Sequence, residues 1–199
     1  MAARTSRTRR RSVRCGSRRS KRRRPRPGGS CLVSTPEPLR LFIALWPETA
    51  MAQALHNWAD GLNWPAGARR HPAAHLHLTL HFLGATAPER VAEIAAALPT
   101  CIEPIELRWG RLQDWGQGLQ VLRPLDPPAA LFDLQQRLGQ RLQALGLPVD
   151  ARRYRPHLTL ARKAPGVLAA QDPDLRWRAS RLVLAQSLRG YHALWSSAD

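Results

Sequence analysis

Apolar and polar positions alternate along several short stretches of this chain, and stretches with helical periodicity lie between them. Alternation with a period of two predicts a half-buried β-strand, and recurrence every three to four residues predicts an amphipathic helix. The clearest helix is predicted over residues 128–145, where leucines share one face and Gly146 follows as the stop. These leucines are Leu131, Leu134, Leu138, Leu142 and Leu145.

The other predicted elements are short and alternate between strands and helices. Two further helices are expected, from Pro47 to about residue 63 and from Pro88 to about residue 98. Strands are predicted at 40–46, 76–83, 105–112, 119–125, 157–161, 181–188 and 191–195. A helix, a basic loop and a strand thus occur in that order twice. We therefore expect an α+β fold with two lobes related by a pseudo-twofold, each an antiparallel sheet backed by helices, with the active cleft between them.

The sequence His-Leu-Thr-Leu occurs twice, at residues 77–80 and 157–160. Residues i and i+2 of a strand share a face, so each copy places an imidazole beside a hydroxyl and turns its leucines to the other face. One copy alone is a weak signal, because any half-buried strand can carry His and Thr. Two copies that both follow a basic loop are much harder to explain as polar residues that happen to lie on a strand surface, and they predict a functional site.

Two histidines and two threonines around one cleft suit phosphoester chemistry without a metal. Imidazole can act as acid or base near neutrality, and a hydroxyl can donate a hydrogen bond to an oxyanion. The candidate catalytic residues are therefore His77, Thr79, His157 and Thr159. The chemistry alone does not say which histidine gives a proton and which takes one.

Three segments resemble the two-histidine phosphoesterases. They are R-L-F-I-A-L at 40–45, H-L-H-L-T-L-H-F-L-G at 75–84 and R-P-H-L-T-L-A-R at 155–162. Within that superfamily the chain is similar to the bacterial and archaeal RNA 2′,3′-cyclic phosphodiesterases, once named 2′-5′ RNA ligases. The resemblance covers about residues 39–195.

This resemblance implies a reaction and assigns roles in it. The expected activity is metal-independent hydrolysis of RNA 2′,3′-cyclic phosphate ends to 2′-phosphomonoesters. By the same resemblance, His77 is the proton donor to the leaving oxygen and His157 is the acceptor that activates water. Two alternatives stay open: a module that binds RNA ends without turnover, and reversible 2′-5′ RNA ligation.

Three further residues are candidate substrate-binding groups. Arg162 occupies the family's basic position after the second motif. Strict alternation would turn it away from Thr159, so a bulge or the strand end is needed to bring it round; otherwise it is a solvated arginine. Tyr154 and Phe42 could stack on a nucleobase, although an aromatic at a strand edge often serves packing alone.

A metal site is the competing interpretation, since alternation along a strand would place His75 and His81 on the same face as His77. Such a site needs carboxylates or thiolates to complete the coordination, and this run has none. We therefore expect no metal and no cofactor, with His75 and His81 on the polar face at the margin of the cleft. Six tryptophans are expected in the core or half-buried shell, without a ligand role: Trp58, Trp64, Trp109, Trp115, Trp177 and Trp195.

The formal net charge of +17 comes largely from one end of the chain. Residues 1–30 hold 13 of the 31 Lys and Arg residues and no acidic residue, whereas 31–199 hold 18 basic and 14 acidic residues. Residues 1–38 are therefore predicted as a basic disordered tail and 39–199 as the catalytic domain. The tail could bind phosphates without specificity. No aromatics alternate with its charges, which favours an extension without function.

Other signals limit the location and partners of the protein. No apolar run approaches the roughly 18 residues of a membrane span, and Cys15, Cys31 and Cys101 form neither a disulfide framework nor a zinc spacing. We expect a cytoplasmic monomer without a membrane partner. Its expected partner is RNA with 2′,3′-cyclic phosphate ends, tRNA fragments included.

Overall fold

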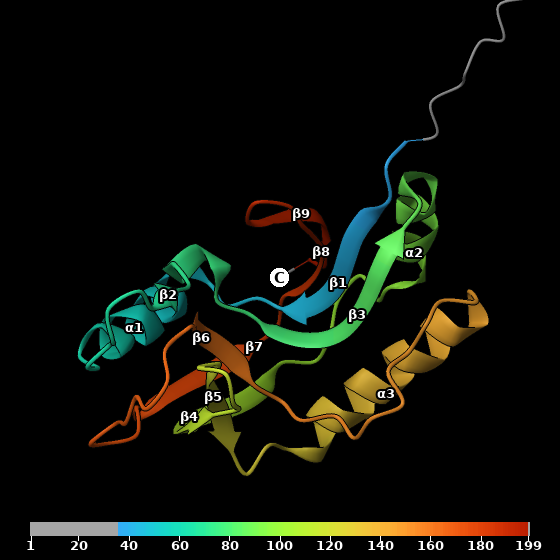
Figure 1. Ribbon diagram of the computed structural model, residues 1–199. Coiled ribbons are helices and arrows are strands. Elements are labelled where there is room, and N and C mark those ends of the chain that lie inside the picture. Colours follow the sequence, from blue (N-terminus) through green and yellow to red (C-terminus); the bar gives the residue numbers. More distant parts are fainter. Residues whose placement is uncertain (1–35, 199) are drawn as a thin grey trace, which may run out of the picture. The chain divides into compact units, whose positions relative to one another are not determined.

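The computed structural model describes residues 36–198 (Figure 1). The predicted basic tail, apart from its last three residues, lies outside the described residues, as do Cys15 and Cys31. Within the described part, Cys101 is exposed and makes no disulfide. No helix of that part has the length and apolarity that a membrane crossing requires.

Helices and antiparallel strands alternate along the chain, which confirms the predicted α+β class. The helices are α1 (Thr49–Asp60), α2 (Val91–Ala97) and α3 (Ala129–Ala144), with short 3₁₀ turns at Ala73–His75 and Pro88–Arg90. The strands are β1 (Leu39–Leu45), β2 (Arg69–Arg70), β3 (Leu78–Thr86), β4 (Ile105–Asp114), β5 (Gln120–Leu125), β6 (Leu158–Arg162), β7 (Leu175–Ala179), β8 (Leu182–Ser187) and β9 (Tyr191–Ser196).

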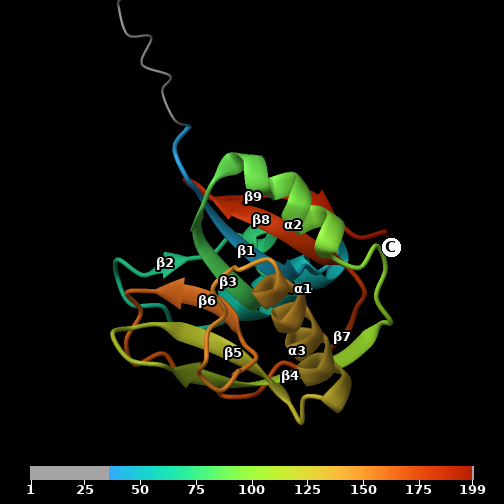
Figure 2. The same cartoon turned by 90° about the vertical axis from the view of Figure 1, so that its right-hand side faces the viewer.

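The strands form one sheet in the order β7-β4-β5-β6-β3-β1-β8-β9, and β2 pairs with β6 outside this path. The sheet has two halves, β7-β4-β5-β6 and β3-β1-β8-β9, which correspond to the two predicted lobes (Figures 1 and 2). The halves meet where β3 lies antiparallel to β6, and one register pair, Leu78 with Leu158, joins them there. Both repeated motifs are therefore at the junction of the halves.

The leucines of both motifs belong to the core, as the alternation predicts. Leu78, Leu80, Leu158 and Leu160 are buried in one cluster with the apolar face of α3. In the same cluster the rings of Trp109 and Trp177 stack with 6.0 Å between their centroids. The polar residues between the motif leucines consequently face away from this core.

The structure adds two strands to the predicted ones and extends a third. The strand β2 lies in a predicted loop, and β7, with only two large apolar residues, has no counterpart among the predicted strands. The strand β3 passes through Gly84 and ends at Thr86, because a glycine adopts the positive φ of +68° there without strain.

Candidate active site

The pairing of β3 with β6 brings the two motifs together. Leu78 lies opposite Leu158 in an antiparallel pair, so the residues on either side of this pair point to the opposite face. The same register places His77 beside Thr159 and Thr79 beside His157. A local twofold axis through the leucine pair thus relates the two motifs to each other.

A cavity of about 410 Å³ lies over these four side chains and is lined by both halves of the sheet. The strands begin at Leu78 and Leu158, so each motif histidine lies immediately before its strand, whereas the sequence predicted it within the strand. Arg40 and Arg162 also line the cavity, and none of the described residues in its lining is acidic. The cavity is therefore suited to an anion.

Both imidazoles are held in the same way. Nδ1 of His77 donates to the carbonyl oxygen of His75 at 2.7 Å, and Nδ1 of His157 donates to that of Arg155 at 2.8 Å. A carbonyl only accepts, so Nδ1 of each ring carries a proton. In the neutral rings Nε2 is then the basic atom, and in an imidazolium it is the acidic one.

Aromatic rings surround His77. Trp46 lies nearly parallel to the imidazole with 4.9 Å between the centroids, Phe42 is tilted at 4.9 Å, and Tyr191 meets it edge-on at 4.8 Å. Burial among these rings lowers the pKa of His77 to about 4, since the imidazolium loses its hydration there. In the free protein His77 is therefore neutral at pH 7.

The surroundings of His157 are cationic. Its ring lies 4.4 Å from that of Trp115, and the guanidinium of Arg155 covers the Trp115 ring at 4.2 Å. Burial lowers the pKa of His157, and the positive charges of Arg155 and Arg123 lower it further. The two histidines thus share one hydrogen-bond geometry in two different electrostatic settings.

A bulge of one residue follows each threonine. Between β1 and β3 the register steps from Ala44–Thr79 to Ile43–His81, which leaves Leu80 without a partner in that register. Between β5 and β6 it steps from Val121–Thr159 to Gln120–Ala161, which leaves Leu160 without one. Each bulge reverses the alternation of the residues that follow it.

The second bulge turns Arg162 onto the face of Thr159, and Arg162 lines the cavity. The first bulge does the same for Phe82, which lies in the cavity wall with 65% of its surface exposed. It also turns His81 out of the cavity over the two motifs and into the lining of an adjoining cavity that Thr79 and His157 share, so His81 lies at the margin of the cleft, as expected. That side chain is buried, and its Nε2 lies 2.7 Å from the carbonyl oxygen of Gln135 in α3.

The two aromatic candidates occupy different places. Phe42 is 1% exposed and packs on His77, so its ring supports the histidine and has no free face for a nucleobase. The Tyr154 hydroxyl donates to the Thr79 carbonyl oxygen at 3.1 Å. Tyr154 lines an adjoining cavity of about 340 Å³, which shares Thr79 and His157 with the first.

Local sequence patterns give little indication of the aromatic residues around the histidines. Trp115, expected in the core or half-buried shell without a ligand role, is half-buried and lines both cavities beside His157. Trp46 and Tyr191 reach His77 from the end of β1 and from β9, and no local pattern connects these segments. Only the position of Trp115 could have been anticipated, because it directly precedes Gly116 in the turn of the β4–β5 hairpin.

Among residues 36–198, no three His, Cys, Asp or Glu side chains converge closely enough to hold a metal ion. His75 shares parity with His77 in the sequence but packs edge-on against Tyr191, with 5.2 Å between the ring centroids. Of the three histidines of the first motif region, at 75, 77 and 81, only His77 lines the cavity over the two motifs.

Comparison with known proteins places this architecture in a family. The model of the 2′-5′ RNA ligase superfamily matches residues 47–190. The RNA 2′,3′-cyclic phosphodiesterase of Escherichia coli is 29% identical over 146 residues, which cover 71% of this chain and 81% of that protein. The RNA 2′,3′-cyclic phosphodiesterase of Bacillus subtilis is 32% identical over 103 residues, which cover 48% of this chain and 55% of that protein.

Solved structures share the fold. A crystal structure of a phosphoesterase superposes with a TM-score of 0.70 at 25% identity, covering 82% of this chain and 100% of that one. The crystal structure of E. coli LigT complexed with 3′-AMP superposes with a TM-score of 0.69 at 24% identity and the same coverage.

Proposed function

The chain belongs to the 2′-5′ RNA ligase superfamily, and from this premise we propose that it hydrolyses 2′,3′-cyclic phosphate ends of RNA to 2′-phosphomonoesters. Its relatives named RNA 2′,3′-cyclic phosphodiesterase support this activity. The observation that carries the proposal is the pair of histidines, each fixed through Nδ1 and related by the local twofold of β3 and β6.

Opening the cyclic phosphate requires two proton transfers on opposite sides of the phosphorus. The attacking water loses a proton and the departing ribose oxygen gains one, which one neutral imidazole and one imidazolium can accomplish. A phosphate bound near the twofold axis has one Nε2 on each side, as in-line displacement requires. The Thr79 and Thr159 hydroxyls then donate to the non-bridging oxygens, where negative charge increases in the transition state.

The different settings of the histidines support one assignment of roles. The positive charges of Arg155 and Arg123 disfavour an imidazolium at His157, which suits the base that accepts a proton from water. The Trp46 ring parallel to His77 attracts a cation through its π face, and a bound phosphate anion raises the pKa of His77. His77 is thereby the proton donor to the leaving oxygen.

The proposal also covers the residues that bind the substrate and the place where the protein acts. Arg162 holds a phosphate oxygen from the wall of the cavity, and Tyr154 borders the space next to His157 that the nucleoside enters. The reaction needs no metal, and residues 39–199 suffice for it. The substrates are RNA ends in the cytoplasm, tRNA fragments among them, and the protein acts as a monomer.

The test is to incubate the purified protein, with a strong chelator, with a short RNA that ends in a 2′,3′-cyclic phosphate. We expect turnover, and chromatography against standards should identify a 2′-phosphate product. A 3′-phosphate product would contradict the proposed product, because it would mean that the 2′ oxygen and not the 3′ oxygen leaves. Turnover that stops with chelator and returns with a divalent metal would contradict the metal-independent mechanism.

The same experiment addresses the two alternatives. Tight binding of the cyclic end without turnover would support an RNA-end binding module. Joining of added RNA with a 5′-hydroxyl end through a 2′-5′ bond would support ligation, which uses the same two proton transfers in reverse.

A further inference from the structure

Two arginines lie directly opposite each other beside the cleft. The register of β2 on β6 pairs Arg69 with Arg162, and Lys163 follows at once in the chain. Like charges directly opposite in an antiparallel pair destabilise it. Within residues 36–198 neither Arg69, Arg162 nor Lys163 has a carboxylate within ion-pair distance.

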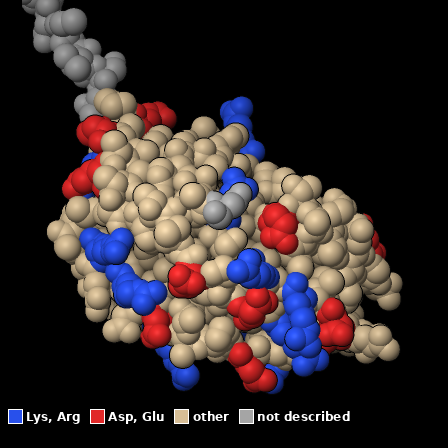
Figure 3. Space-filling model, turned by 180° about the vertical axis from the view of Figure 1, so that it is seen from behind, with Lys and Arg blue, Asp and Glu red and all other residues tan. Residues whose placement is uncertain are grey.

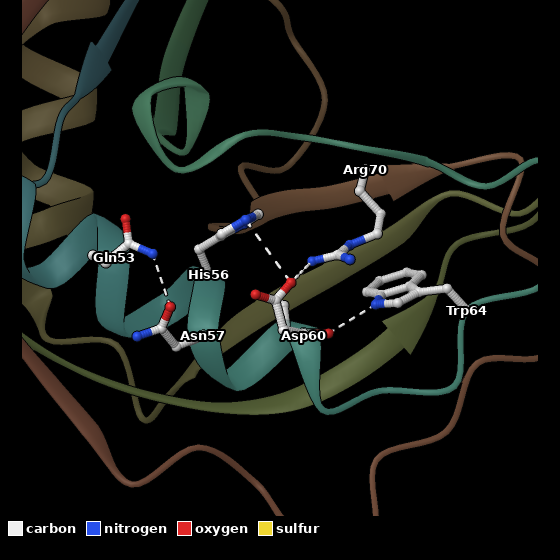
Figure 4. A network of polar contacts seen from close by, with 7 residues as sticks. Gln53, His56, Asn57, Asp60, Trp64 and Arg70 are labelled. Atoms are coloured by element: carbon white, nitrogen blue, oxygen red, sulfur yellow. Dashed lines mark hydrogen bonds and ion pairs between the residues drawn. The ribbon is translucent and has the colours of Figure 1, made fainter.

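The neighbouring Arg70 differs, because it has a structural partner. Its guanidinium forms an ion pair with Asp60 at the end of α1 and covers the Trp64 ring at 5.5 Å (Figure 4). The hydrogen bond from Arg70 lowers the pKa of the Asp60 carboxyl, which also faces His56 at 3.8 Å. Arg70 thus attaches β2 to α1, and Arg69 is held in place opposite Arg162 without an acidic partner among the described residues.

A separate cavity of about 460 Å³ is lined by these three cations together with Trp115 and Gln117. None of the described residues in its lining is acidic. It shares Trp115 and Arg162 with the cavity over the two histidines, so the two spaces adjoin. By contrast, acidic and basic side chains are interspersed on the face of the molecule seen from behind (Figure 3).

The walls of this cavity are fixed by contacts between the β4–β5 turn and the segment after β6. The amide of Ala164 donates to the carbonyl oxygen of Gly118 at 3.0 Å, and Nε2 of Gln120 donates to that of Ala164 at 2.8 Å. A Cβ at Gly118 would lie 2.6 Å from the nitrogen of Ala164, so only glycine allows this approach. Lys163 has a φ of 55°, which is strained for a residue with a Cβ, and this packing holds it there.

We propose that Arg69, Arg162 and Lys163 form a second phosphate subsite, which binds the internal phosphate next to the cyclic end of an RNA chain. An anion relieves the repulsion between Arg69 and Arg162, and three cations without carboxylates can all donate to it. Since Arg162 borders both cavities, the anion lies one side chain away from the phosphorus in the cleft, as the next phosphate of the same chain does. This inference rests on the proposed function and narrows its substrate to an oligonucleotide.

The test compares substrates with and without the second phosphate. Three are needed: adenosine 2′,3′-cyclic phosphate, a dinucleotide with the same cyclic end and a 2′-deoxynucleoside on its 5′ side, and that dinucleotide with a neutral methylphosphonate as its internal linkage. The wild type should prefer the charged dinucleotide to the other two by about tenfold or more in kcat/KM, as charge-assisted hydrogen bonds of about 1.5–3 kcal/mol imply. The preference should weaken with salt.

Two variants remove charge from the subsite without disturbing its backbone. Arg69→Gln keeps most of the side chain, and Lys163→Asn places a residue that tolerates positive φ at that position. Each should lower the preference for the charged dinucleotide about tenfold, mainly through KM, and flatten its salt dependence. The matched control is Arg137→Gln, on the exposed side of α3 and lining a different cavity, which should leave the preference unchanged.

The outcomes separate this inference from the function on which it rests. A wild type that hydrolyses the substrates without preferring the charged dinucleotide overturns the second subsite and leaves the proposed function intact. The second subsite is likewise overturned if both variants keep the wild-type preference with an unchanged melting temperature. A wild type that hydrolyses none of the substrates overturns the proposed function, and this inference with it.

Discussion

Phe82 and Arg162 occupy equivalent positions on the two motif strands, three residues after Thr79 and Thr159, and a bulge turns each of them onto the cleft. The two motifs carry the same histidine and the same threonine, whereas at this later position one carries a phenylalanine and the other an arginine. One side of the cleft presents an exposed aromatic ring, and the other presents a guanidinium. The twofold arrangement of the inner groups is therefore not shared by the wall of the cleft.

The first prediction concerns the acid–base pair. Replacing His77 or His157 with Ala should lower kcat by about 10²–10⁴, because each removes one proton transfer. Both side chains are only half-buried, so the far-ultraviolet circular dichroism spectrum should stay that of the wild type. The control is His192→Ala, an exposed histidine on β9, which should keep full activity. Near-normal turnover in either of the first two variants would remove that histidine from the mechanism.

The second prediction concerns pH. In the free protein the pKa of His77 is about 4 and that of His157 is also lowered, so kcat/KM should be highest below pH 6.5. It should decline at higher pH as His77 loses its proton, and at lower pH as His157 gains one. A bound phosphate anion raises the pKa of His77, so the alkaline limb of kcat should lie at higher pH than that of kcat/KM. Identical limbs in both profiles would contradict this.

A variant can test the origin of the acid limb. The positive charge of Arg155 lowers the pKa of His157, while its carbonyl oxygen accepts the hydrogen bond from Nδ1. Arg155→Gln removes the charge and keeps the carbonyl. The pKa of His157 should rise, and the acid limb of kcat/KM should move to higher pH. A limb that stays in place would assign it to another group.

The third prediction concerns Arg162. Arg162→Ala should lower kcat/KM by at least about tenfold, since it removes a charge-assisted hydrogen bond to phosphate. Arg162→Lys should recover only part of this loss, because an ammonium cannot bind two oxygens with the fixed fork of a guanidinium. The exposed Arg189→Ala in the β8–β9 turn is a suitable control. Full recovery by Lys would mean that only the charge at this position matters.

The fourth prediction concerns the basic segment at the start of the chain. Every group assigned to the site lies at residue 40 or later, so a protein that begins at residue 36 should hydrolyse a cyclic-phosphate dinucleotide as fast as the full chain. With a long RNA, the full chain should bind more tightly at low salt if its arginines contact phosphates. Loss of dinucleotide turnover on truncation would show that the catalytic domain includes residues before 36.

Local pattern is sufficient to predict the elements that carry the site. The alternation in each motif predicts the buried leucines. Alternation alone would turn Arg162 away from Thr159, so its proposed role requires a bulge, and the register of β5 on β6 contains one. The same reasoning does not predict that His81 is buried against α3, because alternation continued past Thr79 gives no indication that Leu80 is the extra residue. A bulge is recognised from its partner strand, which one stretch of sequence does not contain.

The parts that could not be predicted depend on pairings between distant segments. Tyr191 contacts His77 only because β9 pairs with β8 and β8 with β1. Arg69 becomes a neighbour of Arg162 through β2, a strand of two residues without an apolar pattern. In both cases the side chains look like ordinary surface groups until the sheet order is known.

The two halves of the sheet meet at one register pair, Leu78 with Leu158, and the catalytic candidates are its immediate neighbours. The strands β7 and β9 lie at the two ends of the sheet order and take no part in that register. The relative position of the two histidines is therefore set by a single backbone pairing between segments 80 residues apart in the chain.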